Sequence, residues 1–207
     1  MIMNGIDLSK HNRVTSWDLV SKNQKVQFAI LRAGGNYGGF YKDKCFEKYY
    51  DACKNYRLPV GAYYDAGKAF IGTDAGLKDA EHFIKLLSGK QFEMPVAIDI
   101  EVTPPKFKTS ITNACITFCN ELEAAGYYVS IYGADISTFA EELNIQYLDK
   151  FDKWVARIPN KPSYVKKYGI WQYSHSGTIK GIEGLVDLDI AYKNYPKIIK
   201  GAKLNGY

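Results

Sequence analysis

The chain has 207 residues, of which 46% are hydrophobic and 24% are charged, so it suits one sizeable domain or two cramped ones. No apolar run is long enough to predict a transmembrane helix. The formal net charge of +5 favours anionic surfaces, but no dense run of lysine and arginine predicts a nucleic-acid tract. The 17 tyrosines suit sugar or peptide surfaces as well as protein cores.

Eight short apolar runs are typical of β-strands, and each of the first five is followed by a stretch with the apolar spacing of a helix. The predicted strands cover Gly5–Leu8, Phe28–Ala33, Val60–Tyr64, Val96–Glu101, Tyr128–Tyr132, Trp154–Ile158, Gly169–Tyr173 and Leu185–Ile190. The predicted helices cover Trp17–Asn23, Asp43–Tyr56, Thr73–Leu87, Ile111–Ala125 and Ile136–Phe151.

The alternation of strand and helix predicts a parallel sheet with right-handed crossovers. After Phe151 the last three strands follow one another too closely for helices between them. Five βα units followed by three helix-poor strands predict a single-domain α/β barrel with an incomplete ring of helices. We assign residues 1–195 to the barrel and 196–207 to a closing helix, followed by a tail or by a linker toward a further module.

The predicted strand Val96–Glu101 ends in two carboxylates. Because side chains alternate along a strand, Asp99 and Glu101 share one face with Ala97, and their Cα atoms lie about 6.6 Å apart. Two acids at that spacing can act on one bond, whereas burying them is costly because burial disfavours the charged form. The competing interpretation is a strand that runs out into solvent with both acids hydrated.

Catalytic groups of barrel enzymes lie at the carboxyl ends of the strands. Asp7 closes the first predicted strand and Asp187 lies in the eighth, and these strands adjoin in a closed barrel. We therefore expect four acids to converge on one cleft. The alternatives are that Asp7 caps a turn with Ser9, and that the acids of the last strand pair with Arg32 or Lys193.

Five short motifs lie on the predicted strands: Gly5-Ile6-Asp7-Leu8-Ser9, Val60-Gly61-Ala62-Tyr63, Asp99-Ile100-Glu101, Trp171-Gln172-Tyr173-Ser174 and Val186-Asp187-Leu188. Their order resembles glycoside hydrolase family 25, the Chalaropsis-type lysozymes of phage endolysins and bacterial autolysins, up to about Tyr195. The resemblance implies a flattened TIM-like barrel of five βα units and three further strands. It also implies an N-acetylmuramidase that cleaves the β-1,4 bond between N-acetylmuramic acid and N-acetylglucosamine in peptidoglycan.

Carried over residue by residue, the resemblance implies that Glu101 is the general acid/base, with a pKa raised by burial and by the charge of Asp99. Asp99 is then expected to stay ionised. It either acts on the sugar as the nucleophile or orients the 2-acetamido group as an internal nucleophile, and strand spacing does not decide between these roles. Asp7 and Asp187 are implied to be supporting acids of the cleft.

Further residues at strand ends are candidates for binding the substrate. Tyr63, Tyr132 and Trp154 are placed to pack against sugar rings, with core packing as the competing interpretation; Gln172 is placed to hydrogen-bond the acetamido group. Two acids depart from the family pattern. After Tyr63 the family often continues with histidine, whereas this chain continues with Tyr64 and Asp65. Asp65 is either a substrate contact or a turn residue. Asp189 replaces the usual asparagine, and we keep it as a secondary candidate for a substrate contact.

Four cysteines and three histidines show no metal-ligand spacing. Cys115 and Cys119 lie on one predicted helical stripe and are expected in the core as free thiols. His11, His82 and His175 are scattered and are interpreted as surface or loop residues. We expect an enzyme that needs neither a metal nor an organic cofactor.

The expected partner is bacterial peptidoglycan, with no nucleic acid, no membrane insertion and a monomeric chain. The first residues lack the charged and apolar regions of a signal peptide. We therefore expect a phage endolysin made in the host cytoplasm and acting on the cell wall, or an autolysin released to the wall.

The sequence leaves three alternatives to the muramidase interpretation. A chitinase-like hydrolase of family 18 needs a further acid at position 97, which is Ala97 here. A barrel that binds the wall without catalysis is opposed by the presence of all four cleft acids. A nucleotide-binding protein is suggested by the glycine-rich residues 34–39, but these lack the GxGxxG order and a P-loop lysine.

Overall fold

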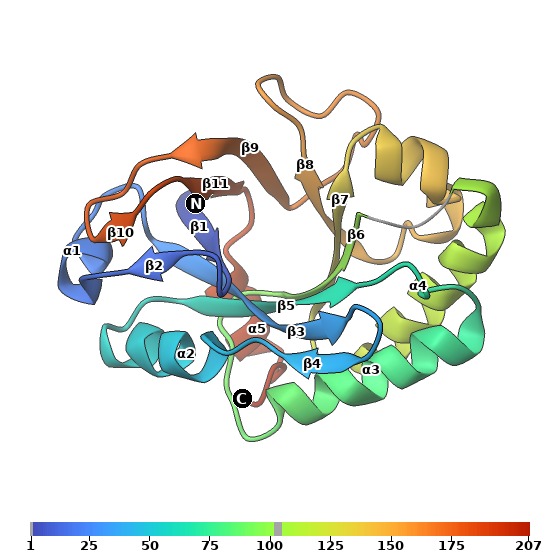
Figure 1. The fold of residues 1–207 in the computed structure, drawn as a ribbon, viewed down its shortest axis with the longest axis horizontal. Coiled ribbons are helices and arrows are strands. Elements are labelled where there is room, and N and C mark those ends of the chain that lie inside the picture. Colours follow the sequence, from blue (N-terminus) through green and yellow to red (C-terminus); the bar gives the residue numbers. More distant parts are fainter. Residues whose placement is uncertain (1, 102–104) are drawn as a thin grey trace.

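The computed structural model describes residues 2–101 and 105–207. Eight strands form a barrel in the order β1-β11-β9-β8-β7-β6-β5-β3, which closes because β1 also pairs with β3. Their bounds are β1 Met3–Leu8, β3 Phe28–Asn36, β5 Val60–Ala66, β6 Val96–Ile100, β7 Val129–Ala134, β8 Asp152–Ala156, β9 Ile170–Gly177 and β11 Val186–Ala191. All eight predicted strands are confirmed, and so is the predicted flattened TIM-like α/β barrel (Figure 1).

The eight barrel strands are parallel except at β11, which runs antiparallel to both of its neighbours, β1 and β9. The connection between β9 and β11 holds only the two-residue strand β10 (Ile182–Glu183), which is too short for the crossover that a parallel neighbour requires. As a result, the amino end of β11 meets the carboxyl ends of the other strands. Asp187 there lies opposite Asp7 in the strand register.

Four of the predicted helices are confirmed, with small shifts of their ends. They are α1 (Trp17–Ser21), α2 (Phe46–Asn55), α3 (Thr73–Leu87) and α4 (Lys108–Ala124), preceded by the 3-10 turn η1 (Pro105–Phe107). Figure 1 shows α3 and α4 side by side along the barrel, and α1 beside the small β2–β10 sheet at the far end. The short strands β2 (Arg13–Val14) and β4 (Phe40–Lys42) were not predicted.

The fifth predicted helix, Ile136–Phe151, is wrong as one continuous α-helix. The chain forms a π-helix, η2 (Ser137–Glu142), and a 3-10 turn, η3 (Ile145–Tyr147). Between them Leu143 has extended backbone angles, and the amide of Asn144 donates to the hydroxyl of Thr112 on α4. A backbone amide that bonds to a neighbouring element is not available to continue a helix.

Alternation along the strands separates two cores. Val96, Ile98 and Ile100 of β6 belong to the larger core between the strands and the helices. Ala97 belongs to the smaller core inside the barrel, which also holds Tyr63. The predicted division of the faces of this strand is therefore confirmed, and Asp99 follows Ala97 on the inner face.

The outer core includes Cys115 and Cys119 of α4, as predicted, and all four cysteines are free thiols. Within residues 2–101 and 105–207, no helix combines the length and apolar character that a membrane crossing requires.

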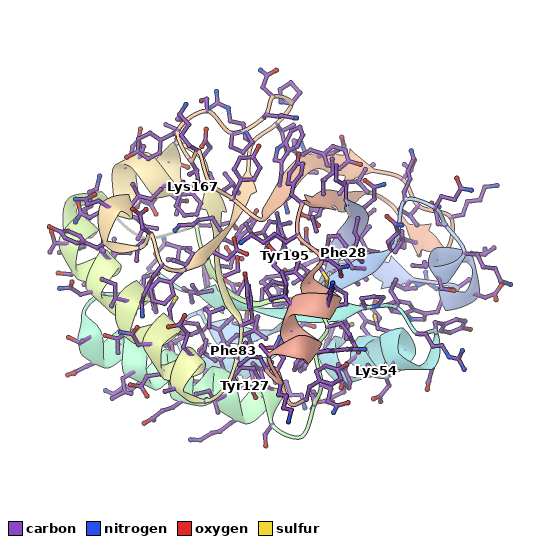
Figure 2. The ribbon with its side chains drawn as sticks, turned by 180° about the vertical axis from the view of Figure 1, so that it is seen from behind. Phe28, Lys54, Phe83, Tyr127, Lys167 and Tyr195 are labelled. Atoms are coloured by element: carbon purple, nitrogen blue, oxygen red, sulfur yellow. The ribbon has the colours of Figure 1, made fainter. Side chains whose placement is uncertain are left out.

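The last residues pack under the barrel. Helix α5 (Tyr195–Gly201) is followed by Asn205, which is fully buried. Its side-chain Nδ2 donates to the Met94 carbonyl at 2.9 Å, and its Oδ1 accepts from the Tyr128 amide at 2.7 Å. Figure 2 views the face on which α5 and Tyr195 lie in front of the barrel. Residues up to Tyr207 thus close the end of the barrel that holds the amino ends of β6 and β7.

Candidate active site

A cleft of about 340 Å³ opens at the end of the barrel where the parallel strands finish. Eight of the ten predicted site residues line it, and they come from seven different strands or from the residues just after them. The lining residues are Asp7, Tyr63, Asp99, Glu101, Tyr132, Trp154, Ala156, Ile158, Gln172, His175 and Asp187. The predicted convergence of four acids on one cleft is therefore what the structure shows.

Asp99 is buried on the inner face of β6, and its Oδ1 has no hydrogen-bond partner among the described residues. Burial raises the pKa of Asp99 well above its ordinary value, and the negative charges of Glu101 and Asp65 raise it further. Arg32 acts in the opposite direction, but its effect is smaller. These surroundings oppose our expectation that Asp99 is simply ionised, because they disfavour its charged form.

Glu101 follows directly after β6 and is partly exposed to solvent, although its carboxyl lines the cleft. Burial of the carboxyl raises the pKa of Glu101, the charge of Asp65 raises it further, and a hydrogen bond from Tyr132 lowers it. The Tyr132 hydroxyl lies 3.4 Å from Glu101 Oε1 and 2.8 Å from Gln172 Oε1, so its one proton points mainly to Gln172 and the bond to Glu101 is the weaker arm. The charge of Glu101 raises the pKa of Asp99, whereas the causes that raise the pKa of Glu101 are burial and other acids, with Asp65 first among them.

A hydrogen-bonded network forms the floor of the cleft. Gln172 Nε2 donates to Asp7 and the Tyr132 hydroxyl donates to Gln172 Oε1, both over 2.8 Å. Trp154 Nε1 donates to Asp189 over 2.8 Å. Gln172 was predicted to bind the substrate, but both ends of its amide are engaged by protein side chains.

Asp189 lies below the cleft and is fully buried. Its carboxyl is hydrogen-bonded to that of Asp7, and burial raises the pKa of Asp189 to about 8. Burial also raises the pKa of Asp7, and the neighbouring charges of Asp189 and Asp187 add to this effect. Two carboxyls in contact need a proton between them, so this pair holds one proton near neutral pH.

Asp65 lies beside the cleft and is not one of its lining residues. Its carboxylate accepts from the Tyr41 hydroxyl over 2.8 Å and pairs with Arg32 over 3.5 Å. Arg32 also pairs with Asp43 over 2.9 Å. Asp65 is thus held in place as a fixed negative charge that acts on both Asp99 and Glu101.

The alternative roles considered for the acids are wrong. Arg32 pairs with Asp43 and Asp65, and Lys193 pairs with Asp152 at the other end of the barrel. Neither pairs with the acids of β11. Asp7 takes part in the floor network described above and does not cap a turn.

His175 is exposed, as expected, and it also lies on the lip of the cleft, which was not predicted. Burial raises the pKa of Asp187, and the neighbouring His175 acts in the opposite direction. Simple alternation would put His175 and Gln172 on opposite faces of β9. Two irregularities in the β9–β11 register bring both to the cleft, because a bulge shifts the side chains that follow it. Ala156 and Ile158 were missed as well, since small and apolar side chains carry no chemical signal.

Among residues 2–101 and 105–207, no group of three or more histidine, cysteine or acidic side chains is arranged to hold a metal ion. Glu101 and Asp7 of the cleft contact tyrosine and glutamine side chains, and Asp189 below the cleft contacts a tryptophan. The site therefore offers several carboxyl groups around one cleft, and these groups differ in burial and in pKa.

Comparison with known proteins assigns the family. The model of glycosyl hydrolases family 25 matches residues 6–182. The chain belongs to this family. The chain is also 29% identical over 188 residues to an autolytic lysozyme of Clostridium acetobutylicum, covering 90% of this chain and 55% of that protein. It therefore spans little more than half the length of that relative.

Solved structures show the same fold. The CTP1L endolysin matches with a TM-score of 0.81 at 25% identity, over 96% of this chain and 70% of that one. A family 25 glycosyl hydrolase from Bacillus anthracis matches with a TM-score of 0.77 at 23% identity, over 96% of this chain and 92% of that one. The expected family and fold are both confirmed.

Proposed function

We propose that this protein is a lysozyme, an N-acetylmuramidase that cleaves the β-1,4 bond between N-acetylmuramic acid and N-acetylglucosamine in peptidoglycan. The observation that carries this proposal is the Asp99–Glu101 pair at the carboxyl end of β6, where burial raises the pKa of both acids. Membership of family 25 and the similarity to an autolytic lysozyme support the class of substrate.

In the proposed reaction, Glu101 begins protonated and gives its proton to the oxygen of the leaving sugar. The bond between that oxygen and the anomeric carbon breaks, and the carbon is attacked either by Asp99 or by the substrate's own 2-acetamido oxygen, oriented by Asp99. Glu101, now a carboxylate, takes a proton from water, and the oxygen of that water bonds to the same carbon while the bond from this carbon to Asp99 or to the acetamido oxygen breaks. Either course requires the proton to lie on Glu101 at the start, and attack by Asp99 also requires Asp99 to be a carboxylate.

The remaining cleft residues have supporting roles in this proposal. Asp7 and Asp187 shape the electric field around the sugar that develops positive charge, with Asp189 fixing Asp7 from below. Tyr63 packs edge-on against Trp154, which in turn contacts Tyr132. These rings form the wall against which a sugar face packs.

The decisive experiment is mass spectrometry of the soluble products released from purified peptidoglycan. New reducing ends on muramic acid are expected. Reducing N-acetylglucosamine, or free stem peptides, would contradict the assigned bond. Sedimentation with the walls and no soluble fragments would instead indicate a barrel that binds without cutting.

Glu101→Gln tests the assignment of the acid. The amide keeps the size of the side chain but cannot deliver the proton, so turnover is expected to fall by at least about 100-fold, with an unchanged unfolding midpoint. Glu183→Gln, an exposed acid far along the chain in β10, is the matched control and is expected to keep the parent rate. Parental activity in the Glu101 variant would show that another group is the acid.

A further inference from the structure

A second and larger groove lies at the opposite end of β7 and β8 from the acid cleft. Its volume is about 870 Å³, against about 340 Å³ for the cleft. Tyr128 and Lys153 form its base at the starts of these strands, and Tyr192 borders it just after β11. None of the residues that line the acid cleft also lines this groove. It is a separate feature of the barrel.

Lysines dominate the charge of this groove. Six lysines line it, against two acids, Asp149 and Asp152. Asp152 is already engaged, because it accepts from the hydroxyls of Tyr128 and Tyr195 and pairs with Lys193. The groove therefore keeps an excess of positive charge.

Three of the lysines, Lys161, Lys166 and Lys167, are exposed and come from the connection between β8 and β9. In the described part of the chain, none of the three forms an ion pair with a carboxylate. Figure 2 labels Lys167 on the face that also carries Tyr195. These positive charges are thus free to meet an external anion.

The connection that carries these lysines is held in a fixed shape. The buried carboxylate of Asp135 accepts from the backbone amides of Ser163, Tyr164 and Val165, and it pairs with Arg157 over 2.8 Å. These hydrogen bonds lower the pKa of Asp135 against the opposing effect of burial, so the anchor stays ionised near neutral pH. A fixed set of charges binds an anion at a smaller entropy cost than a mobile set.

Tyrosines complete the lining. Tyr164 is 42% exposed, and Tyr168 packs edge-on against Tyr192. A tyrosine ring offers an apolar face to carbon-bound hydrogens, and its hydroxyl bonds to other hydroxyls. Cationic and tyrosine side chains in one groove therefore match a polymer that carries both anions and hydroxylated carbon units.

We propose that this groove binds a linear wall polymer of polyol phosphate, with the lysines on the phosphodiesters and the tyrosines on the polyol units. Such binding would hold the protein on the wall while the cleft at the other end of the barrel remains free. It is additional to the proposed hydrolysis and does not depend on it. A protein with this second site recognises an anion that peptidoglycan itself does not carry.

The test measures the binding of fluorescent poly(glycerol phosphate) to the protein by anisotropy, without peptidoglycan present. The parent is expected to bind, and binding is expected to weaken steeply as salt rises. The double variant Lys161→Glu/Lys167→Glu is expected to lose affinity on the order of tenfold or more, because each lysine near a polyanion contributes several-fold. Lys48→Glu/Lys78→Glu, with the same charge change on α2 and α3, is the matched control and is expected to keep most of the affinity.

Several outcomes would overturn the proposal. One is equal loss in both double variants, which would indicate a response to net charge alone. Another is equal or tighter binding of a single-stranded DNA of the same charge, which would make the groove a nucleic-acid site. A third is the absence of binding at low salt. None of these bears on the release of muramic-acid ends from peptidoglycan, so failure here is distinguishable from failure of the proposed lysozyme activity.

Discussion

The acids of this protein differ in what surrounds each of them, and the differences decide which can hold a proton. Asp99 has an unpartnered buried oxygen, Glu101 reaches partly into solvent, and Asp7 and Asp189 contact each other. Burial is the first cause of the raised pKa in all four. The cleft therefore retains protons at pH values where isolated carboxyls have lost them.

Asp65→Asn is expected to move the alkaline limb of the activity profile to lower pH. The charge of Asp65 raises the pKa of both Asp99 and Glu101, so its removal makes the acid form of the pair easier to deprotonate. Arg32 would also lose one partner and act more strongly on Asp99. The shift is expected in the profile of kcat/KM, which reports the acid of the free enzyme.

The measurement is the rate of wall hydrolysis from pH 4 to pH 9 for the parent and the variant. Asp51→Asn, at an exposed position on α2, serves as the control and is expected to leave the profile in place. A limb that moves to higher pH in the Asp65 variant would contradict the role of this charge.

Asp189→Asn is expected to stabilise the protein relative to the parent as pH rises. The pKa of Asp189 in the folded protein is about 8 against an ordinary value of 3.8, so its contribution to stability is fully present below about pH 4 and is lost as pH rises toward 8. Asparagine cannot ionise, yet it still offers an acceptor to Trp154 and a donor to Asp7. The unfolding free energy of the variant relative to that of the parent is expected to rise by about 4 kcal/mol between pH 5 and pH 9, because about three pH units of this range lie below the folded pKa and each is worth about 1.4 kcal/mol.

Urea unfolding at pH 5, 7 and 9 measures this difference. Asp51→Asn again provides the comparison, because an exposed acid should give a difference that hardly changes over the same range. If the difference for Asp189→Asn is also flat, the buried pair does not share a proton as inferred.

At the scale of the elements, hydrophobic pattern predicted which segments form the barrel. Strand β6 shows why. Its alternate side chains face two different cores, so the alternation in its sequence matches its place between the helices and the barrel interior. The segment 136–151 shows the limit. Its apolar spacing is helical, but Thr138 donates to the Ile100 carbonyl and the Asn144 amide donates to the Thr112 hydroxyl. Such contacts between elements cannot be predicted from the spacing of apolar residues within one segment.

The same distinction applies to the candidate site. Acids and aromatic residues at strand ends were found because a barrel gathers strand ends, whatever the loops between them do. His175 was missed because the register irregularities between β9 and β11 turn it toward the cleft. Asp65 and Asp189 were placed near the site, but their protein partners, which set their roles, come from strands far apart in the sequence.

At the scale of the whole molecule, single strands run from the closed end of the barrel to the end that carries the acid cleft. Strand β6 begins beside Asn205 and carries Asp99 near its carboxyl end, so the closing segment and the acid cleft share one element. Besides its two side-chain bonds, Asn205 donates its backbone amide to the Gly126 carbonyl and accepts from the Phe92 amide. Its φ angle of +56° lies in the left-handed region, which asparagine tolerates better than most residues.

Asn205→Ala is therefore expected to lower the free energy of unfolding by about 2–4 kcal/mol. The change leaves the Tyr128 amide and the Met94 carbonyl without their partners, and it places a Cβ-bearing residue with no compensating side-chain bond in the left-handed region. Asn205→Gly loses the same two bonds but avoids the left-handed penalty. Its free energy of unfolding should therefore lie below that of the parent and about 1 kcal/mol above that of the alanine variant.

The measurement combines unfolding in urea with wall hydrolysis at low temperature, where both variants remain folded. A large loss of stability with hydrolysis close to the parent rate is expected, because the closing residues touch the amino end of β6 and not the acids at its carboxyl end. Unchanged stability would show that residues 202–207 are a dispensable tail, whereas a matching loss of hydrolysis would show that the closure also sets the position of Asp99. The order of parent, glycine and alanine separates the lost hydrogen bonds from the backbone strain.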